Sequence, residues 1–184
     1  MARLTIHSPA TAPEESRPLL EAAQARNGFI PNLLGVLANA PTALETYLTV
    51  SGINARASLD LAERETVQLT AATTHGCDFC VAGHTAIARK GGLPEPLIEG
   101  LRGQDRLADE RLEALAAFTR AVIAHRGGVS DEALAAFQHA GYSEQQALEV
   151  VLGVSLATLC NFANSLAKTE LNPELAPHRW RPAA

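Results

Sequence analysis

Two cysteines, a histidine and a glutamate stand at spacings that suit thiol redox chemistry. Cys77 and Cys80 form a Cys-x-x-Cys motif, His84 follows the second cysteine by four residues, and Glu65 precedes the first by twelve. Where such a motif opens a helix, free backbone N–H groups and the positive end of the helix stabilise a thiolate, and the second sulfur is close enough for a disulfide. The pattern therefore indicates a reactive thiol pair.

The residues around the motif predict a helical hairpin over 60–92. Residues 60–63 read as a capping box, and an uninterrupted helical stretch follows until Gly76 breaks it. A second helix is expected over 77–90, with two glycines ending it. The two helices should pack antiparallel to each other.

This hairpin would bring the polar residues together. His84 falls one turn after Cys80 on the same helical face, where an imidazole can accept a thiol proton. At about 1.5 Å per residue, His84 lies roughly 10 Å along the second helix and Glu65 roughly 15 Å along the first. The two side chains are then within reach across the hairpin, and Glu65 could orient the imidazole.

Each residue also has a purely structural interpretation. Buried cysteines often serve as small apolar residues, an isolated histidine is often structural, and Glu65 could be solvated or pair with Arg64. His75 is either a second proton-handling group or a surface loop residue. Cys160 lies in the apolar segment 152–166 without a nearby thiol in sequence, so it is expected to be core packing.

The segment from Glu65 to Gly92 resembles the AhpD-like alkylhydroperoxidases of the carboxymuconolactone decarboxylase superfamily, in their peroxidase-related subgroup. The resemblance rests on the pattern Glu-x11-Cys-x-x-Cys-x3-His and covers residues 20–125 best. It implies an all-α, AhpD-like helical bundle with the Cys-x-x-Cys at the N-terminus of a core helix. The lactone decarboxylases of the superfamily lack the cysteine pair, so its presence argues against that activity.

The resemblance also implies a role for each residue. Cys80 would be the peroxidatic cysteine, Cys77 the resolving cysteine, and Glu65 with His84 the proton relay. The best-studied branch has a histidine just before the second cysteine, where this chain has Phe79. The relay would then be shorter and peroxide turnover weaker.

Together these inferences predict a thiol-dependent peroxidase, an oxidoreductase that reduces hydrogen peroxide or organic hydroperoxides. An external dithiol must reduce the disulfide between the two cysteines, and the resemblance suggests a lipoylated or thioredoxin-like protein as its source. No flavin or nicotinamide motif is visible, so no bound organic cofactor is expected.

Two other functions fit part of the pattern. Phe79 leaves open a thiol redox sensor or a non-catalytic oligomeric scaffold, in which the disulfide forms without turnover. A zinc site could use the two motif cysteines and His84 with Glu65 or His75, although structural zinc sites usually draw on a second ligand pair elsewhere.

Composition predicts a single helical domain over residues 1–184. The chain is 47% hydrophobic and long enough for one sizeable core. Its net charge of −5 is dispersed, which leaves no basic face for nucleic acid. The N-terminus lacks an apolar segment of signal-peptide length, so we expect a cytoplasmic, reducing location, where a cysteine pair is catalytic or metal-binding before it is structural.

The rest of the sequence predicts further helices and no convincing strand. They are expected over 13–28, 31–39, 41–57, 94–101 and 109–125, after Ser130, and over 147–166, where a second capping box at 143–146 opens the helix. The last is apolar nearly all round, which indicates a buried helix; its Ser, Thr, Cys and Asn residues argue against a membrane span. Its two asparagines, Asn161 and Asn164, need partners either in the core or at the active-site wall.

Two features of the sequence favour an assembly of several copies. The helices at 41–57 and 147–166 carry more apolar surface than a monomer can cover, so a homo-oligomer is expected, and the resembled family forms trimers and hexamers. The proline-containing tail over 172–184 carries Trp180, the only tryptophan. We expect this tail to be extended and to lie on a neighbouring subunit.

Overall fold

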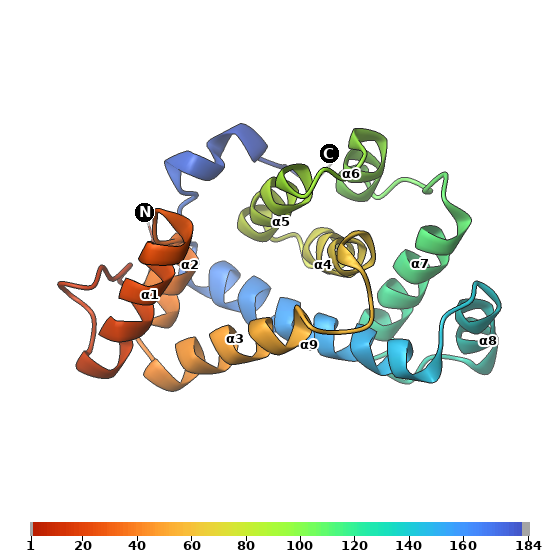
Figure 1. Cartoon of the computed structure of the whole chain (residues 1–184), viewed down its shortest axis with the longest axis horizontal. Coiled ribbons are helices and arrows are strands. Elements are labelled where there is room, and N and C mark those ends of the chain that lie inside the picture. The colour runs from red at the N-terminus through yellow and green to blue at the C-terminus, as the bar shows by residue number, and fades with distance from the viewer. Residues whose placement is uncertain (1, 182–184) are drawn as a thin grey trace.

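The computed structural model describes residues 2–181, which form helices and no strand. In chain order the elements are η1 (Glu14–Ser16), α1 (Arg17–Asn27), α2 (Asn32–Leu37), α3 (Pro41–Asn54), α4 (Leu61–Thr74), α5 (Asp78–Lys90), α6 (Glu95–Gly103), α7 (Glu110–Ala124), α8 (Asp131–His139), α9 (Glu144–Ala167) and η2 (Pro173–His178). Figure 1 shows α4 and α5 near the centre of the molecule, with α9 running below them. The predicted all-α fold is confirmed.

Local sequence signals set the starts of α4 and α9. At α4 the Asp60 carboxylate accepts from the Glu63 N–H at 2.9 Å, and the Glu63 carboxylate accepts from the Asp60 N–H at 2.8 Å. The same reciprocal arrangement, formed by Ser143 and Gln146, opens α9. Such caps satisfy helix N–H groups that lack intrahelical partners and contribute about 1 kcal/mol each. Both predicted capping boxes are confirmed.

Helix α9 is a core helix that packs against α2, α3, α4, α5 and α7. Its length and apolarity alone would suffice to cross a membrane. These contacts bury part of its apolar surface, and several large apolar side chains stay exposed. It approaches α4 closely at Gly153, whose carbonyl accepts from Gln68 Nε2 at 3.0 Å. A Cβ at this glycine would lie 2.9 Å from Val67 Cγ1, so the approach requires the absence of a side chain.

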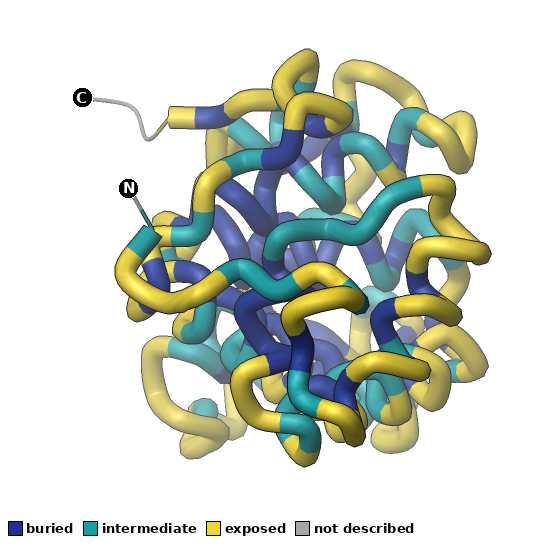
Figure 2. The backbone as a smooth tube through the Cα atoms, turned by 90° about the vertical axis from the view of Figure 1, so that its left-hand side faces the viewer, coloured by how far each residue is buried: buried dark blue, intermediate teal, exposed yellow. Residues whose placement is uncertain are grey.

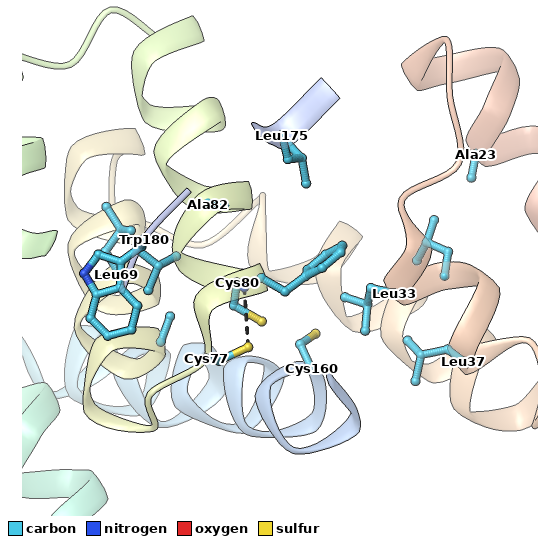
Figure 3. Packing of buried hydrophobic residues seen from close by; sticks show 14 of the residues in the cluster. Ala23, Leu33, Leu37, Leu69, Cys77, Cys80, Ala82, Cys160, Leu175 and Trp180 are labelled. Carbon is cyan, nitrogen blue, oxygen red and sulfur yellow. Dashed lines mark hydrogen bonds between the residues drawn. The ribbon is translucent and has the colours of Figure 1, made fainter. Parts of the chain in front are cut away.

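Two buried apolar clusters fill the interior. One collects residues from α1, α2, α4 and α5 around Cys77 and Cys80 and is shown in Figure 3. The other stacks the rings of Phe118, Phe137 and Tyr142 at the α7–α8 end. Figure 2 shows the buried segments gathered inside and the exposed ones at the periphery. The redox motif therefore lies inside the larger cluster.

The C-terminal tail differs from its expected extended form. Residues 173–178 form the short helix η2, and Trp180 is only 7% exposed because its indole packs into the larger cluster. The indole N–H donates to the Arg102 carbonyl at 2.9 Å. The tail is thus held by α5 and α6 of its own chain, where burial of apolar side chains stabilises it, and the expectation that Trp180 lies on a neighbour is wrong. Residues 182–184 of the predicted tail lie outside the described residues.

The close approach of α4 and α9 yields a stability prediction. Gly153→Ala should lower the free energy of unfolding by about 1–3 kcal/mol, because the new Cβ forces the buried Val67 side chain to move. Gly52 on α3 is the matched control, since a Cβ there would meet nothing within 4 Å. Gly52→Ala should therefore stabilise by about 0.5–1 kcal/mol. Urea unfolding of both variants measures the difference; equal effects would contradict the packing argument.

Candidate active site

The turn between α4 and α5 places the cysteine motif. Gly76 adopts the left-handed conformation, with φ +67°, which a glycine accommodates without steric cost. Cys77 then takes the N-cap position of α5, and its Sγ accepts a hydrogen bond from the Cys80 backbone N–H at 3.4 Å. Both cysteines are buried free thiols, and Figure 3 shows their sulfurs side by side. The predicted position of the motif at a helix start is present in the structure.

Glu65 and His84 meet across the hairpin as the spacing predicted. Glu65, on α4, is 5% exposed, and its Oε2 lies 2.8 Å from His84 Nδ1 on α5. Because the carboxylate accepts, the proton lies on Nδ1, which leaves Nε2 free to accept another. Burial lowers the pKa of His84, but the charge and hydrogen bond of Glu65 outweigh it and raise the pKa above its ordinary value.

No hydrogen bond joins His84 to either motif sulfur within residues 2–181. Direct proton transfer from Cys80 to the imidazole therefore does not occur in this conformation. The role of the two residues as a proton relay stays a prediction, although their mutual contact is present.

The two motif thiols differ in acidity. Hydrogen bonds from the thiol and the backbone N–H of Cys80 lower the pKa of Cys77, against the opposing effect of burial. Donating that thiol hydrogen bond raises the pKa of Cys80, and burial raises it further. The thiol of Cys80 is the main donor, and the N-cap position adds the backbone N–H of Cys80 as a second donor to the sulfur of Cys77. The pKa of Cys77 is thus shifted downward and that of Cys80 upward. The assignment of Cys80 as the peroxidatic cysteine stays a prediction.

Helix α9 contributes polar groups to the site wall that the sequence did not assign. Asn164 Nδ2 donates to Cys80 Sγ at 3.2 Å, and Asn161 Nδ2 lies 2.9 Å from His75 Nδ1. Asn164 therefore lies at the wall of the site, whereas the partner of Asn161 is His75. Burial lowers the pKa of His75, which favours its neutral form. Within residues 2–181, His75 makes no hydrogen bond to either motif sulfur.

Two further side chains border the motif from other helices. Cys160 on α9 lies near the pair in the same buried cluster (Figure 3), and burial raises its thiol pKa to about 12. It is a neutral packing residue, as expected. Tyr47 on α3 packs against this cluster, and burial raises its pKa, so that its hydroxyl stays protonated. Sequence alone did not single out Tyr47, because its neighbours come from distant segments.

An open cavity of about 420 Å³ lies beside Cys77. It is lined by the start of α5 and the C-terminal end of α9: Gly76, Cys77, Asp78, Asn164, Ser165, Lys168 and Thr169. Cys80 is not among the lining residues. Of the two motif sulfurs, the one favoured as the thiolate is therefore the one that a molecule entering from solvent would meet.

The zinc alternative needs at least three ligands held together. Among residues 2–181, no three His, Cys, Asp or Glu side chains are arranged to hold a metal ion. The two motif sulfurs lie together, but the third predicted ligand, His84, is directed to Glu65.

The sequence profile of the Carboxymuconolactone decarboxylase family matches residues 41–121, which include the whole α4–α5 hairpin. No curated protein matches the sequence. Solved structures match across nearly the entire chain at low identity. An uncharacterized peroxidase-related protein from Ralstonia eutropha JMP134, described as an alkylhydroperoxidase AhpD core, is 20% identical with a TM-score of 0.82 and covers 95% of this chain and 94% of its own.

Two other solved structures share the fold. An uncharacterized peroxidase-related protein from Silicibacter sp. TM1040 is 17% identical with a TM-score of 0.79, over 94% of this chain and 92% of its own. A cysteine-to-alanine variant of the debrominase Bmp8, in complex with 2,3,4-tribromopyrrole, is 16% identical with a TM-score of 0.78, over 96% and 95%. These structures show that the chain has an AhpD-like fold. Over residues 41–121 it is also similar in sequence to the Carboxymuconolactone decarboxylase family.

The contact between Glu65 and His84 yields a titration prediction. Glu65→Gln keeps a hydrogen-bond acceptor but removes the charge, so the pKa of His84 should fall as burial is left unopposed. NMR titration of the imidazole measures it. His178, whose Nδ1 contacts Arg89 instead, serves as the internal reference. An unchanged titration of His84 would show that the carboxylate charge does not control it.

The same shift has a consequence for stability. Because the folded-state pKa of His84 is raised, the pair contributes stability that is fully present below the unfolded pKa of about 6.5 and is lost as pH rises through the folded value. Thermal unfolding of wild type should show this loss, and Glu65→Gln should lack it.

Proposed function

We propose that this protein is a thiol-dependent peroxidase that reduces hydrogen peroxide or organic hydroperoxides through Cys77 and Cys80. One observation carries the proposal: the N-cap sulfur of Cys77 is the favoured thiolate, is hydrogen-bonded by Cys80, and borders an open cavity. The AhpD-like fold supports a peroxidase-related function at the level of the family. Glu65 and His84 supply a proton acceptor one turn beyond Cys80.

In the first step the Cys77 thiolate attacks the terminal oxygen of the peroxide. The O–O bond breaks, the leaving oxygen takes up a proton to give an alcohol or water, and Cys77 becomes a sulfenic acid. The thiolate thus loses two electrons, and the peroxide bond gains them.

In the second step the Cys80 sulfur attacks the sulfenic sulfur. Its proton must leave first, and after a rearrangement of the side chain His84 Nε2 can accept it while Glu65 stabilises the imidazolium. Hydroxide leaves as water when it is protonated, and the disulfide between the two cysteines forms. A dithiol on a lipoylated or thioredoxin-like protein then reduces the disulfide by thiol exchange.

The order of the two cysteines is testable by trapping. In Cys80→Ser, one equivalent of hydrogen peroxide should produce a stable sulfenic acid on Cys77, detected by a dimedone adduct and peptide mass spectrometry. Cys77→Ser should react far more slowly, because its remaining thiol has a raised pKa. A rapid adduct on Cys80 in Cys77→Ser would restore the order implied by the resemblance.

Turnover is tested in the same preparation by peroxide consumption with dihydrolipoamide or a thioredoxin system as reductant. We expect catalytic consumption by wild type and none by either serine variant. Disulfide formation in wild type without turnover under any of these reductants would overturn the peroxidase proposal in favour of a thiol sensor.

We also propose that the protein is a homo-oligomer, a trimer or hexamer. Helix α9 exposes large apolar side chains that its own chain leaves uncovered: Leu148, Val151, Phe162 and Leu166. Leu148 and Leu166 are 71% and 64% exposed. A second copy that covers this face would bury them and gain hydrophobic free energy.

The oligomer proposal predicts a change in mass with one substitution. Leu166→Gln should shift the species toward the monomer in light scattering, whereas Leu4→Gln, an exposed leucine outside α9, should not. A monomeric wild-type protein would contradict the proposal.

A further inference from the structure

The side-chain amide of Asn164 is hydrogen-bonded on one side only. Asn164 lies near the end of α9 and is 4% exposed. Its Nδ2 donates to Cys80 Sγ at 3.2 Å, whereas its Oδ1 is buried without a hydrogen-bond partner among residues 2–181. A buried acceptor without a partner costs stability, and native proteins keep few of them. Because a thiol sulfur is also a weak acceptor, this amide contributes little to holding the fold together.

The end of α9 fixes the position of this residue. The backbone N–H groups of Lys168 and Thr169 both donate to the Asn164 carbonyl, the second at 3.1 Å. Cys160 stands one turn earlier on the same face of the helix and lies near the cysteine pair (Figure 3). This face of α9 packs against α5. A fixed helix end therefore presents the amide to the Cys80 sulfur.

Among residues 2–181, Asn164 is the one side chain outside the motif that donates a hydrogen bond to a motif sulfur. His84 is directed to Glu65 instead. An N–H donor favours the thiolate over the thiol, because the anion is the stronger acceptor. Donation of its thiol to Cys77 and burial raise the pKa of Cys80, and the hydrogen bond from Asn164 opposes both. The amide therefore assists the motif thiol that is harder to ionise.

We propose that Asn164 is a catalytic residue for disulfide formation, whose amide stabilises the Cys80 thiolate as that sulfur attacks Cys77. The inference rests on the proposed function and assigns a residue to its second step. In that step Cys77 has become a sulfenic acid, so the negative charge must develop on Cys80 before the two sulfurs can bond. The amide already lies at hydrogen-bond distance from the sulfur that takes this charge.

The contact fits each change in that step. The Cys80 thiol gives up its proton to the base of the proposed function, His84, and the Asn164 N–H stabilises the charge left on sulfur. The thiolate then forms the S–S bond with Cys77 while the S–O bond of the sulfenic acid breaks. The departing hydroxide takes up a proton, so a sulfenic acid and a thiol become one disulfide and one water. Since a disulfide sulfur is neutral, the amide binds the thiolate more strongly than the product.

Thiol titration tests the contact without any peroxide. In a Cys77→Ser, Cys160→Ser background, Cys80 is the only thiol of the chain. The ultraviolet absorbance of its thiolate is recorded against pH with Asn164 present and with Asn164→Leu. At a fixed pH below the midpoint, the thiolate fraction should fall about tenfold, as expected for one hydrogen bond to a charged group. Asn164→Ala, which cannot overfill the site, should show the same fall.

Gln68 supplies the matched control. It is an equally buried amide, 4% exposed, but its Nε2 donates to the Gly153 carbonyl at 3.0 Å and not to a sulfur. Gln68→Leu should lower the urea midpoint of unfolding and leave the Cys80 titration unchanged. Asn164→Leu should do the reverse. It raises the pKa of Cys80 yet keeps or increases the urea midpoint, because it also removes the unpaired Oδ1.

A second measurement follows the reaction step itself, in protein with all of its cysteines. One equivalent of hydrogen peroxide is added to the reduced protein, and dimedone traps the sulfenic acid that has not yet closed to the disulfide. Asn164→Leu should give several times more adduct on Cys77 than wild type or Gln68→Leu, because the attack by Cys80 is slower.

The outcomes separate this inference from the proposed function. An unchanged Cys80 titration in Asn164→Leu and Asn164→Ala would overturn the role of Asn164, whatever the protein does with peroxide. A shifted titration with unchanged trapping would overturn its part in disulfide formation while the proposed function stands. A wild-type protein that hydrogen peroxide and organic hydroperoxides leave unoxidised would overturn the proposed function and the catalytic role with it, even where the titration shows the contact to Cys80.

Discussion

The chemistry of the site depends on one placement, the sulfur of Cys77 at the N-terminal cap of α5. That position supplies a backbone N–H at 3.4 Å and the positive end of a helix, and it makes the thiol of Cys80 a donor to its neighbour. The left-handed Gly76 permits the turn, and the α4–α5 hairpin holds the remaining groups around it. Without this cap the two cysteines would be ordinary buried thiols, since burial alone raises thiol pKa values.

Helix α4 carries two buried carboxylates that are satisfied in different ways. Glu63 accepts a hydrogen bond in its own helix cap and forms an ion pair with Arg111. Its charge is therefore compensated by groups that take no part in the proposed reaction. Glu65, two residues later, has His84 as its titratable partner. Removing the partner of either carboxylate would leave a buried charge uncompensated, which is destabilising. The same helix thus separates a structural carboxylate from one whose partner can exchange protons.

The sequence predicted what depends on short-range pattern. Capping boxes, glycine stops and helical spacing are local, so the α4–α5 hairpin and the start of α9 could be located, and the contact of Glu65 with His84 followed from their depths in that hairpin. The acidity order of the cysteines could not be predicted, because it depends on which sulfur meets the free N–H group. The roles of Asn164 and of the tail depend on how distant segments pack, as the buried Trp180 shows.

The buried position of Trp180 has a practical consequence. The chain contains a single tryptophan, and it lies in the same buried cluster as both motif cysteines, with its indole N–H tied to α6. Its fluorescence therefore comes from one known environment, without background from other indoles. Any loosening of the tail or repacking of the cluster when the sulfurs change state would alter the polarity around that ring. The protein thus carries an intrinsic optical reporter of its own thiol pair.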